Sequence, residues 1–284
     1  MLNKKMIKNV IVAAACSFTL LAALPAADAG RGGSDGVIRS AVRTNNADAI
    51  ISALEQSENI PCNTECMTMV MDLFDNDDYR IRQVAAWWIA RRPAQMKEAA
   101  ELATAWLSLD DSVKARNGAD ILGTFGYAKF IPVLSAAVVK PGMSVDARAA
   151  AVRALGNIAN MDANPVVASA MADADASVRL NAVVAWKNML KQTDAEPVVA
   201  LVADSDLTVR RAAVATVGHF RVATARTSLE AAVVGDADPA LRRNAAWSLG
   251  RIGDAASRDA LLAATTDESS MVRMTAKVAL AKLR

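Results

Sequence analysis

The chain has 284 residues and a formal net charge of +2, and its length is enough for one or two domains with a sizeable core. Hydrophobic residues make up 53% of the chain but aromatic residues only 4%, and the many Ala and Val side chains suit closely packed helices better than strands. A charge so close to balance argues against a nucleic-acid-binding protein, which normally carries a basic excess.

The first 29 residues have the features of a secretory signal peptide. A start with three lysines precedes the uncharged apolar run 10–24, and Ala27 and Ala29 supply the small residues of a cleavage site. We therefore expect cleavage after Ala29 and export to the periplasm or the cell exterior. An uncleaved membrane anchor is one alternative, but the run is shorter than the roughly 20 residues of a spanning helix. A lipoprotein attached through Cys16 is another, and the residues before Cys16 fit it poorly.

The charge balance is closer still in the expected mature chain. Residues 1–29 contain three of the 32 basic and one of the 30 acidic residues, so 29 of each remain. The two signs are interspersed without like-charge runs, which gives no electrostatic membrane attachment. We expect no nucleic-acid partner and no membrane span after signal removal.

A self-similar pattern with a period of 31 to 33 residues runs from about residue 78 to the end. Equivalent positions, which we call anchor positions, are Arg82, Ala115, Arg148, Arg179, Arg210, Arg242 and Arg273. Four residues before each anchor stands Asp or Ser, side chains that accept hydrogen bonds from free N–H groups at a helix start. The predicted helix caps are Asp78, Asp111, Ser144, Asp175, Asp206, Asp238 and Ser269.

Residues at fixed offsets after the anchor predict one face of a helix, here called the A helix. Ala or Gly stands at offset +3, as expected where helix backbones approach closely, and a large apolar residue stands at +7. In four repeats Gly follows at +8, which is typical of a bend or a helix end. Second apolar stretches at 130–134, 165–167, 197–201 and 260–262 predict B helices. Such short helix pairs bury their apolar faces only by stacking on neighbouring pairs.

The pattern is fullest in VRRAAVATVG at 209–218 and LRRNAAWSLGRIG at 241–253. These segments resemble the phycobilisome-lyase-like HEAT repeat, and the resemblance extends over about residues 75 to 284. It implies an all-α fold, a right-handed α-solenoid of about seven to eight HEAT-like helix-pair repeats. The family includes chromophore lyase subunits, regulatory scaffolds and exported proteins, so fold similarity alone implies no activity.

These features divide the chain into four expected parts. They are a signal peptide at 1–29, a flexible leader at 30–36, a degenerate N-terminal repeat with a cysteine pair at 37–75, and a repeat solenoid at 76–284 that ends in a capping helix. Within the degenerate repeat we expect helices at 37–43, 47–55 and 66–74.

No residue pattern indicates a catalytic, metal or cofactor site. His219 is the single histidine, and a lone imidazole is a poor metal site and a base without an orienting partner. Deoxyhypusine hydroxylase, an enzyme built from helical repeats, uses His-Glu pairs for its di-iron site, and this chain has none. The lyase function cannot be tested residue by residue, because its motif is the fold itself, but export argues against it.

Cys62 and Cys66 form a C-x3-C motif, which is neither a thioredoxin-like C-x-x-C nor a haem-attaching C-x-x-C-H. An even pair in an exported protein favours a disulfide, and two residues one helical turn apart are within bonding range. Redox activity and metal binding are the alternatives.

The anchor arginines and two tryptophans each allow a structural and a functional interpretation. An Arg that recurs at one offset is best explained by pairing with a capping Asp or a carbonyl of a neighbouring repeat. Trp87 and Trp247 stand at offset +5, where other repeats have mixed chemistry. We expect them to be partly exposed and to pack against a B helix, although Trp is enriched at binding hot spots.

The second repeat departs most from the pattern. Ala115 replaces the anchor arginine, Gly118 replaces Ala at +3, and Asp120 stands beside the core face. Since Gly inside a helix is less stable than Ala, we expect this repeat to be the weakest joint of the stack.

Together these features favour an exported, non-enzymatic scaffold that binds a protein or peptide. An accessory subunit of an envelope enzyme or electron-transfer complex is the main alternative, and a lyase or a thiol oxidoreductase using Cys62 and Cys66 is a further one. Charged residues on the expected B helices that the repeat does not explain are candidate partner contacts: Lys129, Lys191, Arg226, Glu230, Arg258 and Asp259. Their mixed signs predict a partner of mixed charge.

Overall fold

The structure is a computed structural model that describes residues 35–283. The expected signal peptide 1–29, with Cys16, lies outside the described residues, as does most of the expected leader. Every regular element in 35–283 is an α-helix or a short 3-10 helix, the latter labelled η, and this part of the chain contains no strand. The all-α prediction is therefore confirmed. None of the helices in the described part is both long and apolar enough to cross a bilayer.

Seven A helices begin directly after the seven predicted caps. They are α5 (Tyr79–Ile89), α7 (Ser112–Phe125), α9 (Val145–Ile158), α11 (Ala176–Asn188), α12 (Leu207–Phe220), α14 (Pro239–Ile252) and α16 (Ser270–Leu280). The B helices are α6 (Pro93–Trp106), α8 (Ile131–Val139), α10 (Asn164–Ala170), η5 (Glu196–Ala203), α13 (Arg226–Gly235) and α15 (Arg258–Ala264). Single turns η3 (Ala128–Phe130), η4 (Met161–Ala163), η6 (Ala223–Ala225) and η7 (Ala255–Ser257) precede four of them.

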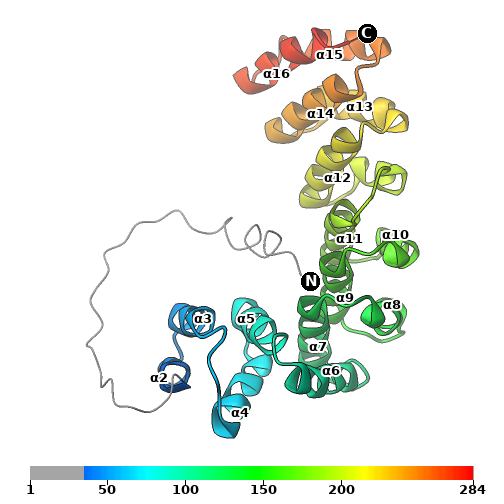
Figure 1. Cartoon of the computed structure of the whole chain (residues 1–284). Coiled ribbons are helices and arrows are strands. Elements are labelled where there is room, and N and C mark those ends of the chain that lie inside the picture. The colour runs from blue at the N-terminus through cyan, green and yellow to red at the C-terminus, as the bar shows by residue number, and fades with distance from the viewer. Residues whose placement is uncertain (1–34, 284) are drawn as a thin grey trace, which may run out of the picture. The chain divides into compact units, whose positions relative to one another are not determined.

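The helix pairs stack in chain order from α5 to α16. Each A helix packs on the next A helix, and each B helix packs on the A helix that follows it. Figure 1 shows the resulting two rows, with the A helices along one side and the B helices along the other. The chain therefore forms an α-solenoid of HEAT-like repeats, as the sequence predicts.

Small buried residues set the spacing between the helices. The alanines at offset +3, such as Ala151, Ala213 and Ala245, are fully buried. The glycines at +8 correct our expectation of a bend or a helix end, because all four lie inside A helices. A Cβ on Gly123 would stand 2.6 Å from the Cα of Ala154 on the next A helix. Gly at +8 therefore lets consecutive A helices touch.

Three helices precede the regular repeats. They are α2 (Asp35–Thr44), α3 (Ala47–Gln56) and α4 (Thr64–Asp72), and the turn η2 (Leu73–Asp75) follows α4. The first helix begins at Asp35, inside the expected flexible leader 30–36, and the side chain of Arg39 pairs with Asp35 at 3.3 Å. The third begins two residues before the expected Cys66, because Asn63 caps it by accepting from the backbone N–H of Cys66.

The fourth helix pair is the least regular of the stack. Lys187 occupies the offset +8 that Gly holds in four other repeats, and α11 ends one residue later at Asn188. Its partner η5 is a 3-10 helix over its whole length. Because 3-10 hydrogen bonds have poorer geometry than α-helical ones, the structure gives this pair the features of a loose joint.

Candidate functional site

The predicted caps occupy the N-cap positions of the seven A helices. Six of them accept a hydrogen bond from a backbone N–H in the first helical turn, and Ser269 makes no such bond. Asp206, for example, accepts from Thr208 at 2.8 Å and from Val209 at 3.1 Å. These side chains therefore satisfy N–H groups that a helix start leaves free.

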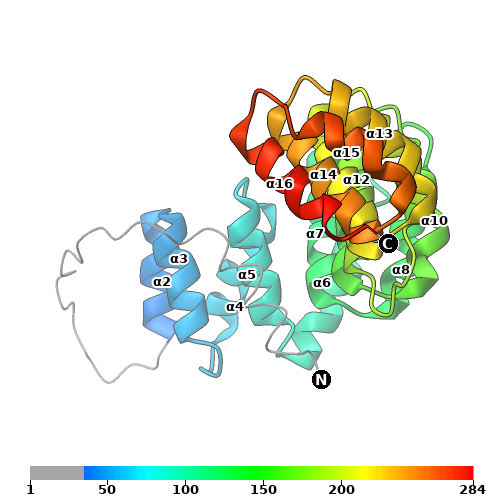
Figure 2. The ribbon, with the colours of Figure 1, turned by 90° about the horizontal axis from the view of Figure 1, so that it is seen from above.

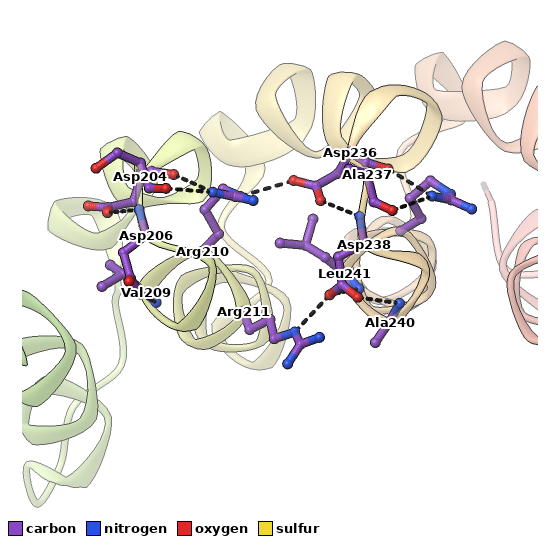
Figure 3. A network of polar contacts seen from close by, with 12 residues as sticks. Asp204, Asp206, Val209, Arg210, Arg211, Asp236, Ala237, Asp238, Ala240 and Leu241 are labelled. Carbon is purple, nitrogen blue, oxygen red and sulfur yellow. Dashed lines mark hydrogen bonds and ion pairs between the residues drawn. The ribbon is translucent and has the colours of Figure 1, made fainter. Parts of the chain in front are cut away.

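Each internal anchor arginine from Arg148 onward joins two repeats through its guanidinium, as Figure 3 shows for Arg210. The Nη1 group of Arg210 donates to the carbonyl oxygen of Asp204 at 2.8 Å and to that of Ser205 at 3.1 Å. Its Nε group donates to a carboxylate oxygen of Asp236 at 3.0 Å. Since Asp204 lies before α12 and Asp236 before α14, one side chain fastens consecutive inter-repeat turns together.

The same arrangement recurs along the stack, and we call it the Arg–Asp ladder. Its ion pairs are Arg148–Asp173, Arg179–Asp204, Arg210–Asp236 and Arg242–Asp267. Arg273 donates to the carbonyl oxygens of Asp267 and Glu268 and forms no ion pair within the described residues. The stack therefore explains the anchor arginines.

The acid of each pair differs from the one that the sequence pattern predicts. The pattern predicts a capping Asp or a carbonyl as the partner. Carbonyl contacts are present, but the carboxylate comes from the residue two positions before the cap. Asp236 has a second contact that fixes it there, since it accepts from the backbone N–H of Asp238 at 2.8 Å. The signal is present in the sequence as Asp-x-Asp or Asp-x-Ser before the helix, at Asp173, Asp204, Asp236 and Asp267.

The ladder arginines lower the pKa values of three of its carboxylates. Hydrogen bonds from Arg148, Arg179 and Arg242 hold the pKa values of their respective partners Asp173, Asp204 and Asp267 below the usual value for Asp. A carboxylate with a lowered pKa that is already bound to a guanidinium is a poor general base. These residues thus hold the stack together and are unsuited to acid–base catalysis.

The second repeat has a different and more buried ion cluster, centred on Asp120 of α7. Arg82 of α5 donates to one carboxylate oxygen of Asp120 at 2.7 Å, and Arg153 of α9 donates to the other at 2.5 Å. The side chain of Asp120 is 1% exposed and that of Arg82 is 3% exposed. The position two residues before the cap Asp111 holds the apolar Leu109, so Asp120 supplies the carboxylate for Arg82 and ties three consecutive A helices together.

Tyr79 completes this cluster from α5. The Arg153 guanidinium lies 4.8 Å from the centre of its ring, and burial raises the pKa of its phenol. The cluster therefore combines two guanidinium groups, one carboxylate and a neutral phenol. Asp120 and Arg153 both stand at offset +5, and their side chains meet between the neighbouring A helices α7 and α9.

Cys62 and Cys66 form a disulfide, with Cα atoms 5.5 Å apart. The bridge spans the start of α4, where Cys66 is fully buried and Cys62 packs partly buried against the core. Because the closed loop is small, this bond stabilises the fold only modestly.

The six candidate partner residues lie in different local settings. Lys191 lies in the turn between α11 and η5, outside any helix, and Lys129 lies in η3. In α13, Arg226 pairs with Glu230 at 2.8 Å, and Glu230 accepts from Ser257 at 2.8 Å. The charges of Arg226 and Glu230 therefore stabilise neighbouring turns.

The two remaining candidates are exposed. Arg258 and Asp259 lie at the start of α15 and form no ion pair in the described part of the chain.

The outer face of the A helices carries exposed apolar side chains that the charge pattern of the sequence does not reveal. Val184 on α11, Trp247 on α14 and Val278 on α16 stand at offset +5 and are all exposed. Trp87 at the same offset is covered by Arg91, whose guanidinium lies 3.7 Å from the ring centre. The expectation of partial exposure therefore holds for Trp87 and Trp247, whereas Asp120 at the same offset is buried.

His219 lies at the end of α12, with its ring edge-on to Phe220. Its backbone carbonyl accepts from Arg251 at 3.3 Å. Within 35–283, no group of three or more His, Cys, Asp and Glu side chains is arranged to hold a metal ion.

A family model described as HEAT repeats matches residues 137–218 and 195–281, which together cover just over half of the chain. The comparison with curated proteins finds no match.

Solved structures with similar folds include YibA of Escherichia coli, with 16% sequence identity, a TM-score of 0.57, and coverage of 81% of this chain and 96% of that one. Kap95p in its complex with RanGDP has 14% identity and a TM-score of 0.54 over 83% of this chain and 38% of its own. The CpcE–CpcF phycocyanin lyase of Nostoc has 20% identity and a TM-score of 0.42 over 80% and 97%. At these identities the likeness concerns the fold alone.

Proposed function

Because the chain belongs to the family of HEAT-repeat proteins, we propose that it is an exported, non-enzymatic scaffold that binds a protein or peptide partner. Stacked repeats form extended surfaces that such proteins use for binding. The observation that carries the proposal is that the recurrent charged side chains and the exposed apolar side chains have different surroundings. The ladder uses the recurrent charges inside the stack, while Val184, Trp247 and Val278 point apolar groups outward at one offset.

Export is part of the proposal and is supported by two features. The basic start, the apolar run 10–24 and the small residues Ala27 and Ala29 are typical of a cleaved signal. The Cys62–Cys66 disulfide is typical of an oxidising compartment.

A binding function is favoured over catalysis by the state of the ionisable groups. Asp173, Asp204 and Asp267 are bound to guanidinium groups that lower their pKa values. His219 contacts Phe220 and has no carboxylate or nucleophile that would orient it as a base in the described part of the chain.

The test is capture of the partner by cross-linking in the native cells. The full-length protein with a C-terminal tag is cross-linked, purified from the exported fraction and analysed by mass spectrometry. A Val184→Ser/Trp247→Ser/Val278→Ser variant should lose the partner, whereas Val139→Ser, which changes an exposed apolar residue on the B helix α8, should retain it.

Three results would contradict the proposal. They are a protein that stays in the cytoplasm with Met1 intact, the absence of a reproducible partner, and equal capture by all variants. An enzyme or electron carrier as the captured partner would instead indicate the accessory-subunit role.

A further inference from the structure

The last two A helices present an apolar surface that no part of the described chain covers. Trp247 on α14 is 41% exposed, and Met271, Met274 and Val278 on α16 are 53%, 60% and 52% exposed. Met271, Met274 and Val278 follow one face of α16, because their spacing of three and four residues matches the helical repeat. We call these four residues, together with Arg243 and Arg251, the C-terminal surface.

The two helices bring these side chains onto a single face. Helices α14 and α16 lie side by side in Figures 1 and 2, and a Cβ on Gly250 would come within 2.8 Å of Ala279. Trp247 and Val278 have the same offset +5 on these two packed helices. Since packed helix axes lie about 8–10 Å apart, the surface has the width of one further helix.

Positive charge without a counter-ion flanks the apolar residues. Arg211 on α12 pairs with Asp238, the cap of the next A helix, at 2.7 Å. Arg243 has the same offset on α14, but the next cap is Ser269, which has no charge. Among the described residues, the guanidinium of Arg243 therefore reaches only the amide oxygen of Asn244, at 3.1 Å.

Arg251 supplies the second unneutralised charge. It donates to the backbone carbonyl of His219 at 3.3 Å, lies 5.6 Å from the centre of the Trp247 ring, and forms no ion pair in the described part of the chain. Neither α14 nor α16 contains an acidic residue.

We propose that the C-terminal surface binds an amphipathic helix of a partner protein, with apolar side chains over Trp247 and Met274 and carboxylates paired to Arg243 and Arg251. This inference rests on the proposed scaffold function and specifies its partner. A helix that lays apolar anchors along such a surface is a common mode of peptide recognition. The complementary charges fix its orientation and speed its association.

The position of an acidic residue favours a peptide over an anionic membrane. The exposed Glu268 lies just before the start of α16, which carries three of the apolar residues. A flat anionic lipid surface would meet this carboxylate as well as the arginines, whereas a peptide can direct its acids toward Arg243 and Arg251 alone.

The test uses the purified protein and two fluorescent synthetic peptides of about 18 residues, long enough to form a helix. Both have Leu on one face, and the polar flanks carry Glu in one peptide and Lys in the other. Fluorescence anisotropy at about 50 mM NaCl, where surface charges are weakly screened, should give a Kd of about 10 μM or below for the Glu peptide. The Lys peptide should bind at least about tenfold more weakly.

Variants then locate the site. Trp247→Ala should weaken binding of the Glu peptide by about tenfold or more. The double variant Arg243→Glu/Arg251→Glu should reverse the preference, so that the Lys peptide binds better than the Glu peptide. Val139→Ser, which changes an exposed residue on the B helix α8, should leave both affinities unchanged, and thermal unfolding checks that each variant is folded.

The inference would be overturned if neither peptide bound, if Trp247→Ala bound as the wild type does, or if charge reversal did not change the preference. Binding only to vesicles with anionic lipids, or concentration-dependent dimerisation through this face, would also overturn it by assigning another occupant. If the peptides fail while the cross-linking experiment captures a partner, the scaffold function stands and this inference alone is wrong.

Discussion

Replacing Asp120 by Asn should destabilise the protein more than any change in the regular Arg–Asp ladder. The substitution keeps the size of the side chain but removes the negative charge between Arg82 and Arg153. Arg82 is 3% exposed, so its guanidinium would be left in the interior without a counter-ion. Removing one partner of a buried ion pair costs about 3–5 kcal/mol.

Two features of the structure set the expected value at the lower end of this range. Arg82 keeps hydrogen bonds to the carbonyl oxygens of Asn76 and Asp77 at 2.7 and 2.9 Å. Arg153 is about one-third exposed, so water replaces part of its lost interaction. We therefore expect a loss of about 3 kcal/mol in the free energy of unfolding, which corresponds to a fall of about 6–12 °C in Tm.

The assay is urea and thermal unfolding followed by circular dichroism, with Asp173→Asn as the matched control. Asp173 has the same kind of partner in Arg148, but both side chains are more exposed, so the control should lose only about 1 kcal/mol. The double variant Arg82→Leu/Asp120→Leu should lose less than Asp120→Asn, because no buried charge on α5 is then left unpaired. A loss below about 1 kcal/mol for Asp120→Asn would refute the reasoning.

Gly118→Ala should destabilise by about 1–3 kcal/mol in urea unfolding despite the better helix propensity of Ala, because its Cβ would lie 2.5 Å from the carbonyl oxygen of Ala103. Gly235→Ala, where the added Cβ meets nothing within 4 Å, should be neutral or stabilising. Because the pKa values of Asp173, Asp204 and Asp267 are lowered in the folded state, their contribution is present above the unfolded pKa of about 3.9 and is lost as pH falls through the folded values. Thermal midpoints should accordingly change little from these groups between about pH 7 and 5 and fall below about pH 4, and a midpoint that rises there would contradict the ladder. Amide hydrogen exchange should be slower over 112–125 than over 196–203, and the opposite order would restore the second repeat as the weakest joint.

The exchange prediction reverses an expectation from the sequence, and the reversal has a physical cause. Helix propensity predicts that Gly118 destabilises its helix. In the structure, however, α7 lies so close to Ala103 that a Cβ at this position would have no room. Likewise, the sequence places Asp120 as a polar residue beside the core, whereas in the structure it neutralises Arg82. A pattern within one repeat cannot show which residues of other repeats lie opposite.

The regular part of the structure was predictable because it depends on contacts within one period of the sequence, whereas the exceptions depend on contacts between repeats. Helix starts depend on local chemistry, so the seven N-cap residues, of which Asp78 is the first and Ser269 the last, could be placed from their spacing alone. The arginine partners lie 25 or 26 residues away, within one period, and the Asp-x-Asp signal marks them in the sequence. Asp120 pairs with Arg82, 38 residues before it, and with Arg153, 33 residues after it. It stands at offset +5, where the repeats share no residue type, so the period does not predict its pair with Arg82.

Two of the departures from the repeat chemistry have different consequences. At Ala115 the anchor charge is missing, and Asp120 compensates inside the stack, so the departure stays structural. At Ser269 the capping charge is missing, and nothing in the described residues compensates, so Arg243 keeps an unneutralised charge beside exposed Trp247 and Met274. A departure from the repeat pattern that no other contact in the fold compensates is a site where function is expected. The cap position of the last repeat, rather than the surface charges of the B helices, is therefore the departure that points to a partner.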